Sequence, residues 1–308
     1  MIAVIGATGF TGQRVVACLR QQHPGEELCA IVRHQRPREP FVDEGVSVRT
    51  ADLADIEALQ RAFDGARLVA STVSLGFGHA PNLVRALVAT RPDHVILFST
   101  MSIYSTLPLE SREIRMEAER LIAESGLPAT VFRPTMIYGR PGDRNIERLL
   151  RFLRRSPVMP LVGLGTSLQQ PVHVDDLAVA VGRAFQATNT IGRSYNLPGP
   201  RAMPFVEMIH QAARAIDRRP VLILVPLGLA HSAVRAWSTT GLWPKVRGDQ
   251  VLRLAEDKKG DPAPAIRDFG YSPREFDQGV KEEAALLGLT TPTVARGHDG
   301  ALPGQHLG

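Results

Sequence analysis

The glycine-rich stretch near the start of the chain limits the possible folds most strongly. Residues 6–12 read GATGFTG and follow an apolar run, IAVI, that is typical of a buried strand. A helical pattern begins directly afterwards, with Val15, Val16 and Leu19 on one face. Three glycines between a strand and a helix allow a tight turn and close backbone packing. We therefore predict a strand–turn–helix unit at the N-terminus.

Strand-length apolar runs alternate with helical patterns through the first half of the chain. After the strand at 2–7 and the helix at 11–21, further strands are expected at 27–33, 46–52, 67–73, 94–100 and 129–134. Helical patterns separate the later ones at 55–63, where Asp55 is a candidate N-cap, 81–90 and 110–125. Such alternation predicts a doubly wound α/β fold with a parallel sheet covered by helices on both faces.

The regular alternation ends near residue 140, where segments with proline and glycine mix with helices. We predict that residues 1–140 form the main domain and that 173–197 return to it. Residues 141–172 and 198–290 would then form a small C-terminal lobe for the substrate. The final stretch, 291–308, lacks apolar periodicity and is expected to be a disordered tail.

The composition and net charge indicate which kind of molecule the protein binds. Hydrophobic content of 44% with 22% charged residues is ordinary for a soluble globular protein of 308 residues. The net charge of +5 comes mainly from arginines scattered among acidic residues, and no nucleic-acid motif is present. We therefore expect an anionic small molecule as the partner and no nucleic acid.

Localisation is predicted from two further features. The chain begins without a signal-peptide pattern, and its longest apolar run, 221–230, is too short to span a bilayer. That run is expected to be a packed helix or strand, with contact to a membrane surface as the alternative. We predict a cytoplasmic protein with no membrane span.

Three side chains that could be reactive are predicted to have structural roles. Cys18 and Cys29 fall in a helical pattern and in an apolar strand, so we expect neither a disulfide nor a metal site. His173 is also expected to be structural, because Asp175 or Asp176 would suit the N-cap of the helix that follows it.

The glycine loop and its context indicate a dinucleotide site. Gly6 would permit the turn, Gly9 would let the backbone approach a pyrophosphate, and Gly12 would allow close helix–strand packing. The free N–H groups at the start of the helix would face the phosphates. A purely structural glycine turn is the alternative, but the strand–turn–helix context favours binding.

The residues after the second expected strand indicate which dinucleotide is bound. At the place where an NAD site has an acidic residue, the chain reads Arg33-His34-Gln35-Arg36, with Arg38 close by. A guanidinium can bind a ribose 2′-phosphate, whereas a carboxylate would repel it. We predict NADP(H) as the cofactor, with NAD(H) as the second choice. The alternative is that these arginines are solvated loop charges.

These stretches together resemble the short-chain dehydrogenase/reductase superfamily, in its extended or atypical branch, which includes NAD-dependent epimerase/dehydratases. Beside the glycine loop, the resemblance rests on ADL (51–53), STMSIY (99–104), FRPTMIYG (132–139), PVHVDDLA (171–178) and RDFGYSPREFDQG (267–279). It covers residues 1–290 and implies a Rossmann fold and a nicotinamide cofactor. The predicted cofactor-binding residues are Gly6, Thr8, Gly9, Phe10, Gly12, Arg33, Arg36, Asp52, Leu53, Thr72, Ser99, Arg115 and Pro134.

The helix in 107–122, LPLESREIRMEAERLI, lacks the residue pair that active members of this superfamily use for proton transfer. In those relatives a tyrosine acts as the general acid/base, and a lysine four residues later lowers its pKa. Aligned on the following Ala-Glu pair, the two positions hold Ser111 and Arg115 in this chain. No other register supplies the pair, because no tyrosine lies between Tyr104 and Tyr138.

Hydroxyl groups near the expected nicotinamide are candidate replacements. Ser102 is predicted to orient the substrate, and Tyr104 or Tyr138 to donate the proton. The alternative is that the serine satisfies backbone groups at the strand end and that Tyr138 is structural, as it usually is in the superfamily.

An amphipathic helix is predicted over 143–156. In extended relatives this region borders the substrate pocket, so we predict that Asn145 and Arg148 bind an anionic substrate. A solvated face or an oligomer contact is the alternative for the arginines that share this helix face, namely Arg144, Arg148, Arg151 and Arg155.

Two hypotheses for function follow. The first is an NADP(H)-dependent atypical oxidoreductase or epimerase-like enzyme that acts on a sugar nucleotide or on another small carbonyl or hydroxyl compound. The second is a non-catalytic NAD(P)(H)-sensing or assembly protein, similar to NmrA-like regulators or to the accessory subunit of respiratory complex I. The superfamily resemblance also suggests a homodimer.

Overall fold

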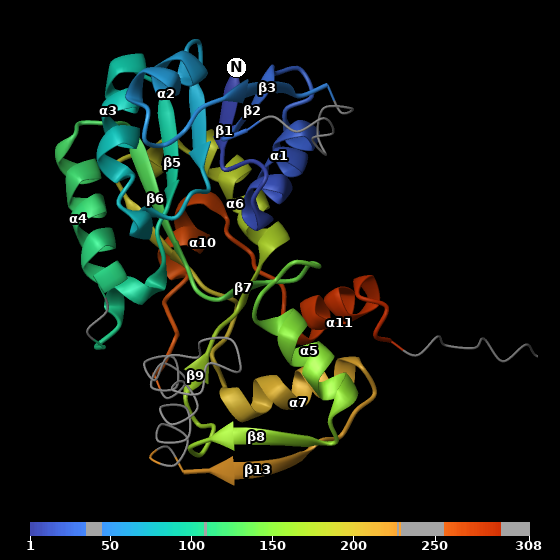
Figure 1. Ribbon diagram of the computed structural model, residues 1–308. Helices are drawn as coiled ribbons and strands as arrows, with labels where there is room; N and C mark the ends of the chain where they lie inside the picture. Colours follow the sequence, from blue (N-terminus) through green and yellow to red (C-terminus); the bar gives the residue numbers. More distant parts are fainter. Residues whose placement is uncertain (35–44, 108–109, 227, 229–255, 291–308) are drawn as a thin grey trace, which may run out of the picture.

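The computed structural model describes residues 1–34, 45–107, 110–226, 228 and 256–290 (Figure 1). The predictions for Arg36 and for a disordered tail at 291–308 lie outside the described residues.

A seven-stranded sheet forms the centre of the molecule. Its strands are β1 (Ile2–Ile5), β2 (Leu28–Val32), β3 (Ser47–Thr50), β4 (Leu68–Ser71), β5 (His94–Phe98), β6 (Ala129–Pro134) and β11 (Ser194–Leu197). They lie in the order β11-β6-β5-β4-β1-β2-β3, and all neighbours are parallel. The order reverses between β1 and β4, which is the position of the ligand site in folds of this type. The predicted doubly wound α/β fold is confirmed.

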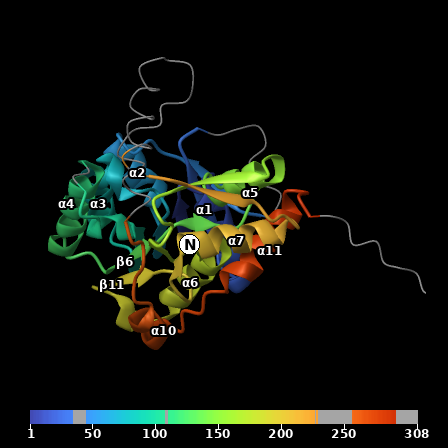
Figure 2. The same ribbon diagram turned by 90° about the horizontal axis from the view of Figure 1, so that it is seen from below.

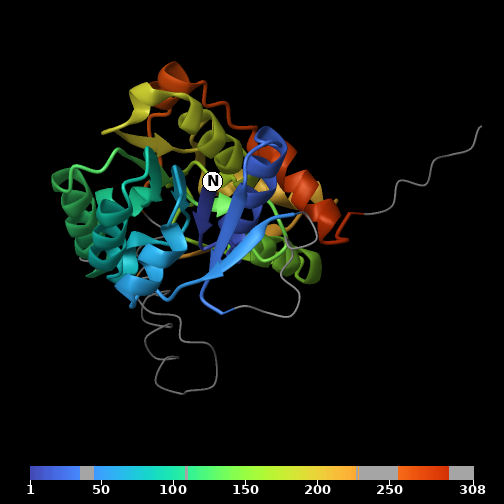
Figure 3. The same ribbon diagram turned by 90° about the horizontal axis from the view of Figure 1, so that it is seen from above.

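Helices cover both faces of this sheet, as Figure 3 shows from above. One face packs against α1 (Phe10–Gln22) and α6 (Val174–Gln186), and the other against α2 (Ile56–Phe63), α3 (Ala80–Thr90) and α4 (Glu110–Glu124). Neighbouring residues of β1 point to opposite faces, so Val4 lies in the first core and Ile5 in the second. Burial on both faces explains why the central strands are apolar throughout.

A third core lies beyond the carboxyl ends of the sheet strands (Figure 1). It joins α5 (Ile146–Arg155), α7 (Phe205–Ala215) and α11 (Phe276–Leu286), which pack on one another as Figure 2 shows from below. A two-stranded parallel sheet, β8 (Val158–Val162) and β13 (Val221–Val225), borders this core. The 221–230 run therefore begins as a strand, in line with the default expectation for it.

Several short elements complete the structure. They are the paired strands β7 (Ile137–Tyr138) and β10 (Val172–His173), the paired strands β9 (Leu168–Gln169) and β12 (Met203–Pro204), the helix α10 (Ala263–Phe269), and the 3-10 turns η2 (Leu75–Phe77), η3 (Met101–Tyr104) and η4 (Thr188–Thr190). The helix α6 packs on α1, and β11 extends the main sheet beyond β6. The exact division of the chain into a main domain and a lobe stays a prediction.

The helix caps include one confirmed prediction and one that is wrong. Asp55 caps α2, because its carboxylate accepts a hydrogen bond from the Ala58 N–H at 2.9 Å. At α6, however, the N-cap is His173, whose Nδ1 accepts from the Asp175 N–H at 3.2 Å. Asp175 and Asp176 lie in the first helical turn instead, because ion pairs with arginines distant in sequence hold both carboxylates.

Candidate functional site

The glycine loop turns sharply at the end of β1. Gly6 has a φ of 82°, a left-handed conformation that disfavours side chains, and Thr72 at the end of β4 hydrogen-bonds its carbonyl at 3.2 Å. A Cβ built at Gly12 would overlap the Gly6 carbonyl oxygen. The first turn of α1 can therefore pack against the loop only with glycine at position 12.

The start of α1 fits a phosphate group. Its N-cap is Gly9, which offers no side chain to the first N–H groups, and the first turn contains no acidic residue. A cavity of about 700 Å³ lies over this helix end. Uncapped N–H groups and the positive end of a helix dipole attract anions. The cavity lining includes Thr8, Gly9, Phe10, Gln13, Arg14, Arg140, Gly142, Arg144 and Asn145.

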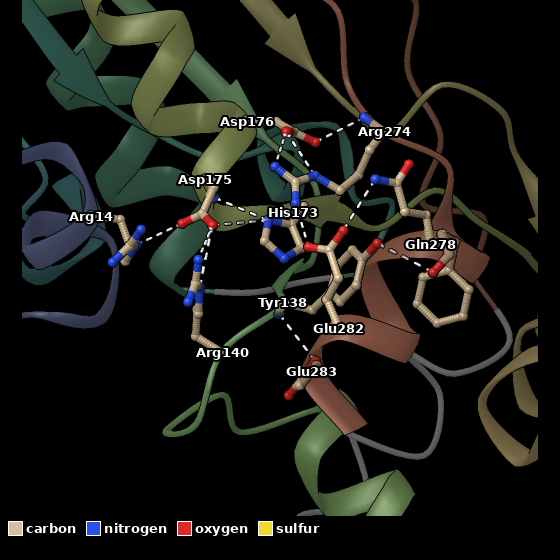
Figure 4. Close-up of polar contacts among 12 residues, drawn as sticks. Arg14, Tyr138, Arg140, His173, Asp175, Asp176, Arg274, Gln278, Glu282 and Glu283 are labelled. Atoms are coloured by element: carbon tan, nitrogen blue, oxygen red, sulfur yellow. Dashed lines mark hydrogen bonds and ion pairs between the residues drawn. The ribbon is translucent and has the colours of Figure 1, made fainter. Parts of the chain in front are cut away.

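Two arginines of this cavity share one carboxylate (Figure 4). Asp175 accepts from Arg14 Nε at 2.6 Å and from Arg140 Nη2 at 2.5 Å. Burial acts to raise the pKa of Asp175, but the hydrogen bonds from Arg140 and Arg14 outweigh it and lower the pKa. Two cations on one anion leave the wall of the cavity positive, which suits a pyrophosphate. Sequence reasoning missed this pair.

Two predicted cofactor-binding residues, Arg33 and Asp52, meet at the ends of β2 and β3. Arg33 is exposed, and its Nε lies 3.6 Å from Asp52 Oδ2 in a surface ion pair. Asp52 also accepts from the Ala54 N–H at 2.8 Å, so its carboxylate is held in place. A 2′-phosphate would therefore have to compete with Asp52 for the Arg33 guanidinium.

Other predicted cofactor residues lie at strand ends. Ser99 is buried at the end of β5, and its Oγ has no hydrogen-bond partner among the described residues. Pro134 is buried at the end of β6, and Leu53 is buried beside Asp52. Because these positions are all at the carboxyl edge of the sheet, they lie where ligands of this architecture bind. Their contacts with a cofactor stay predictions.

A second cavity, of about 480 Å³, lies next to the first and shares Asn145 with it. Ser102 and Tyr104 line it from η3, and Arg148 lines it from α5. Two of the three predicted catalytic hydroxyls and the predicted anion-binding residues therefore line one cavity. Its remaining lining is Thr100, Met101, Ser105, Thr135, Met136, Glu256, Asp257, Lys258 and Lys259.

The groups of this second cavity differ in how firmly they are held. Tyr104 is half exposed, and its hydroxyl accepts a hydrogen bond from Arg133 Nη1 at 2.8 Å. Arg148 has no ion-pair or hydrogen-bond partner among the described residues, whereas Arg151 on the same helix pairs with Glu147 at 2.7 Å. Arg148 is thus a cation of this cavity whose guanidinium is not engaged by another described residue.

The segment 256–259 is a part of the cavity that sequence reasoning missed. Glu256 accepts hydrogen bonds from the Ser105 hydroxyl at 2.8 Å and from the Thr106 N–H at 2.7 Å. These bonds hold the segment against the loop that follows β5. The charged run EDKK was a visible signal, but nothing local indicates which strand end it contacts.

Tyr138 does not fit its predicted role as a proton donor. The side chain is fully buried, and its ring lies 5.4 Å from that of His173 (Figure 4). It also lies 5.0 Å from the ring of Phe276. Burial raises the pKa of its phenol, and the hydroxyl lies 3.5 Å from the Phe276 carbonyl oxygen. It lines neither of the two cavities. Its burial and contacts therefore favour the structural alternative for Tyr138, and its role in catalysis stays a prediction.

The helix that lacks the tyrosine–lysine pair lies close to the site without lining it. The Arg115 guanidinium packs against the backbone of Gly76 after β4, and its Nη1 donates to the Ser111 carbonyl at 2.8 Å. Neither residue lines either cavity. A contact between Arg115 and the cofactor stays a prediction.

Comparison with known proteins supports the same assignment. A family model described as NAD(P)H-binding matches residues 6–151. The ceramide reductase of Caulobacter vibrioides is 30% identical over 269 residues, which cover 80% of this chain and 81% of that protein. The chain belongs to the short-chain dehydrogenase/reductase superfamily of NAD(P)H-binding Rossmann proteins. It is a member of an oxidoreductase family, and its cofactor is NAD(P)H.

Two further similarities extend over nearly the whole chain. The 2-alkyl-3-oxoalkanoate reductase of Stenotrophomonas maltophilia is 25% identical over 327 residues, covering 91% of this chain and 97% of that protein. The structure of Citrobacter sp. triphenylmethane reductase complexed with NADP(H) superposes with a TM-score of 0.74 at 20% identity, covering 91% of this chain and 99% of that one. The second similarity shows the fold alone.

The described residues contain neither a metal cluster nor a membrane-spanning helix. Within them, no group of three or more histidines, cysteines or acidic residues is arranged to hold a metal ion. No helix among them is long and apolar enough to cross a membrane. The homodimer and the cytoplasmic location stay predictions.

Proposed function

We propose that this protein is an NADP(H)-dependent reductase of a small carbonyl compound that carries an anionic group. The observation that carries the proposal is the second cavity, a space of about 480 Å³ whose lining includes Ser102, Tyr104 and Arg148. A volume of this size suits a small molecule. The cavity adjoins the one over the glycine loop through Asn145, so a dinucleotide held there would reach its edge.

The reduction requires a hydride donor, a proton donor and groups that bind the substrate. When bound, NADPH supplies the hydride that adds to the carbonyl carbon. The Tyr104 hydroxyl donates the proton to the carbonyl oxygen, and the Ser102 hydroxyl orients that oxygen. Arg148, assisted by Asn145, binds the anionic group. The alcohol leaves, and solvent returns a proton to Tyr104.

A 3-oxoacid is the substrate type that we favour over a sugar nucleotide. The relative named 2-alkyl-3-oxoalkanoate reductase supports a ketone beside a carboxylate. The segment RDFGYSPREFDQG resembles the C-terminal segment of sugar-nucleotide enzymes, but its residues make structural contacts in this chain. Its Arg274 pairs with Asp176 at 2.8 Å, and its buried Tyr271 donates to the Pro198 carbonyl at 2.7 Å. Packing therefore accounts for this motif without a nucleotide substrate.

Arg148→Gln tests the anion site through two probes that differ only in a carboxylate, 3-oxooctanoate and 2-heptanone. We expect the variant to raise KM for 3-oxooctanoate by about 10-fold or more, because a charge-assisted hydrogen bond of about 1.5–3 kcal/mol is lost. The KM for 2-heptanone should not change. The loss of NADPH absorbance measures both reactions.

The matched control for this variant is Arg151→Gln, which removes a paired arginine from the same helix. An equal effect of both variants, or an equal effect on both probes, would contradict the anion site. A wild-type chain that binds NADPH and reduces neither probe would instead support the non-catalytic sensing or assembly protein.

Arg33→Ala tests the preference for NADP(H). We expect the dissociation constant of NADPH to rise about 10-fold while that of NADH stays the same, because only the 2′-phosphate contacts the guanidinium. The effect is limited because Arg33 is exposed and already pairs with Asp52. Fluorescence titration measures both constants. Arg61→Ala, which removes an exposed arginine paired with Glu57, is the control, and equal wild-type affinities for the two cofactors would contradict the preference.

A further inference from the structure

Arg133 is an arginine that lies beside the second cavity without lining it. It lies on β6, and its side chain is only 19% exposed. Glu119 of α4, only 11% exposed, binds it through two nitrogens, with Nε 3.0 Å from Oε2 and Nη2 in a closer contact with the same oxygen. Burial acts to lower the pKa of Arg133, but the pairing with Glu119 outweighs it and raises the pKa. The guanidinium is therefore a permanent, fixed positive charge.

The third nitrogen of this guanidinium points at the proposed proton donor. Nη1 is not used by Glu119 and donates to the Tyr104 hydroxyl at 2.8 Å, while the guanidinium carbon lies 5.7 Å from the centre of the tyrosine ring. Asn196, the register partner of Arg133 on β11, has its Oδ1 3.5 Å from the same hydroxyl. The phenol is thus held from the side of the sheet, and Tyr104 lines the cavity.

We infer that the Glu119–Arg133 ion pair positions Tyr104 and stabilises its oxygen as the proton leaves. It would thereby replace the lysine that lowers the pKa of the catalytic tyrosine in active relatives. This inference rests on the proposed function. When Tyr104 gives its proton to the carbonyl oxygen, its own oxygen gains negative charge. Arg133 already donates a hydrogen bond to that oxygen, so no group has to move during the step. An arginine keeps its own proton, so it acts only through Tyr104.

The ion pair also explains how α4 can still contribute to the site without the tyrosine–lysine pair. The helix has serine and arginine at positions 111 and 115, where the superfamily pair would be, but it still contributes Glu119 to the site. The positive charge is supplied from β6 instead of from α4. Arg133 is a positioning residue, because it contacts Tyr104 and does not line the cavity.

A double-mutant cycle between Tyr104→Phe and Arg133→Met tests this role, with NADPH and 3-oxooctanoate as the probes. We expect Arg133→Met alone to lower kcat about 10- to 100-fold with little change in KM, because a preorganised donor to a developing anion is lost. Arg133→Lys should recover part of the loss. The double variant should be no slower than Tyr104→Phe alone, since Arg133 has nothing left to act on.

Arg120→Met is the matched control, because Arg120 pairs with the exposed Glu117 and Glu124 on the same helix as Glu119. It should leave kcat unchanged, and NADPH titration should show that every variant is folded. An unchanged kcat in Arg133→Met, or additive losses in the double variant, would overturn the inference and leave the proposed function intact. A Tyr104→Phe variant with full kcat would overturn the proton-donor role of Tyr104 and this inference with it. A wild-type chain that leaves the probe unreduced would overturn the proposed function.

Discussion

Tyr104→Phe is expected to lower kcat for 3-oxooctanoate reduction by about 10²–10⁴-fold, the usual contribution of a positioned general acid. The phenylalanine ring keeps the shape of the cavity wall and removes only the hydroxyl that Arg133 and Asn196 hold. Because half of the side chain is exposed, the free energy of unfolding should change little. Steady-state kinetics and an NADPH titration of the variant measure the two effects separately.

Tyr138→Phe is the matched control for this prediction. It removes a phenol hydroxyl whose closest partner is a carbonyl oxygen 3.5 Å away, and the residue is buried outside both cavities. Its kcat should equal that of the wild type. If Tyr138→Phe loses turnover and Tyr104→Phe keeps it, Tyr138 is the proton donor and Tyr104 is not.

Gly12→Ala is expected to abolish NADPH binding and to lower the free energy of unfolding by about 1–3 kcal/mol, the usual cost of overpacking. The new methyl group would overlap the Gly6 carbonyl oxygen, so α1 must move away from the loop. Its first N–H groups would then no longer face the phosphates, and the contribution of the helix end to anion binding would be lost. Fluorescence titration and denaturant unfolding measure the two effects.

Gly25→Ala is the control for the glycine loop. A Cβ built at Gly25 meets no atom within 4 Å, and its backbone is not in the left-handed region. Binding and stability should therefore stay close to those of the wild type. A Gly12→Ala variant that binds NADPH normally would contradict the interpretation of GATGFTG as a phosphate-binding loop.

Much of the fold could be predicted because its signals are local. The apolar strands around β1, the glycines at 6, 9 and 12 and the amphipathic α5 depend on residues within one or two turns of each other. The seven-stranded order then follows from repeated βαβ units, which allow few arrangements. The absence of a tyrosine–lysine pair likewise concerns a single helix, so the sequence alone shows it.

The predictions that failed depended on contacts between residues far apart in the chain. Asp175 and Asp176 looked like helix caps, but Arg14, Arg140 and Arg274 bind their carboxylates across distances of 35 to 161 residues. An ion pair with a guanidinium holds a carboxylate more strongly than a neutral cap does. His173 is the N-cap of α6, because ion pairs with arginines hold the carboxylates of both aspartates.

The sequence by itself determined the class of fold, the dinucleotide loop and the absence of tyrosine and lysine from α4, since each is set by local spacing. Only the tertiary structure decided which tyrosine borders a cavity and which is buried. It also brought Tyr104 from the end of β5, Arg133 from β6 and Glu119 from α4 to one place. The physical reason is that strand order and side-chain burial, not periodicity along the chain, determine which charges meet.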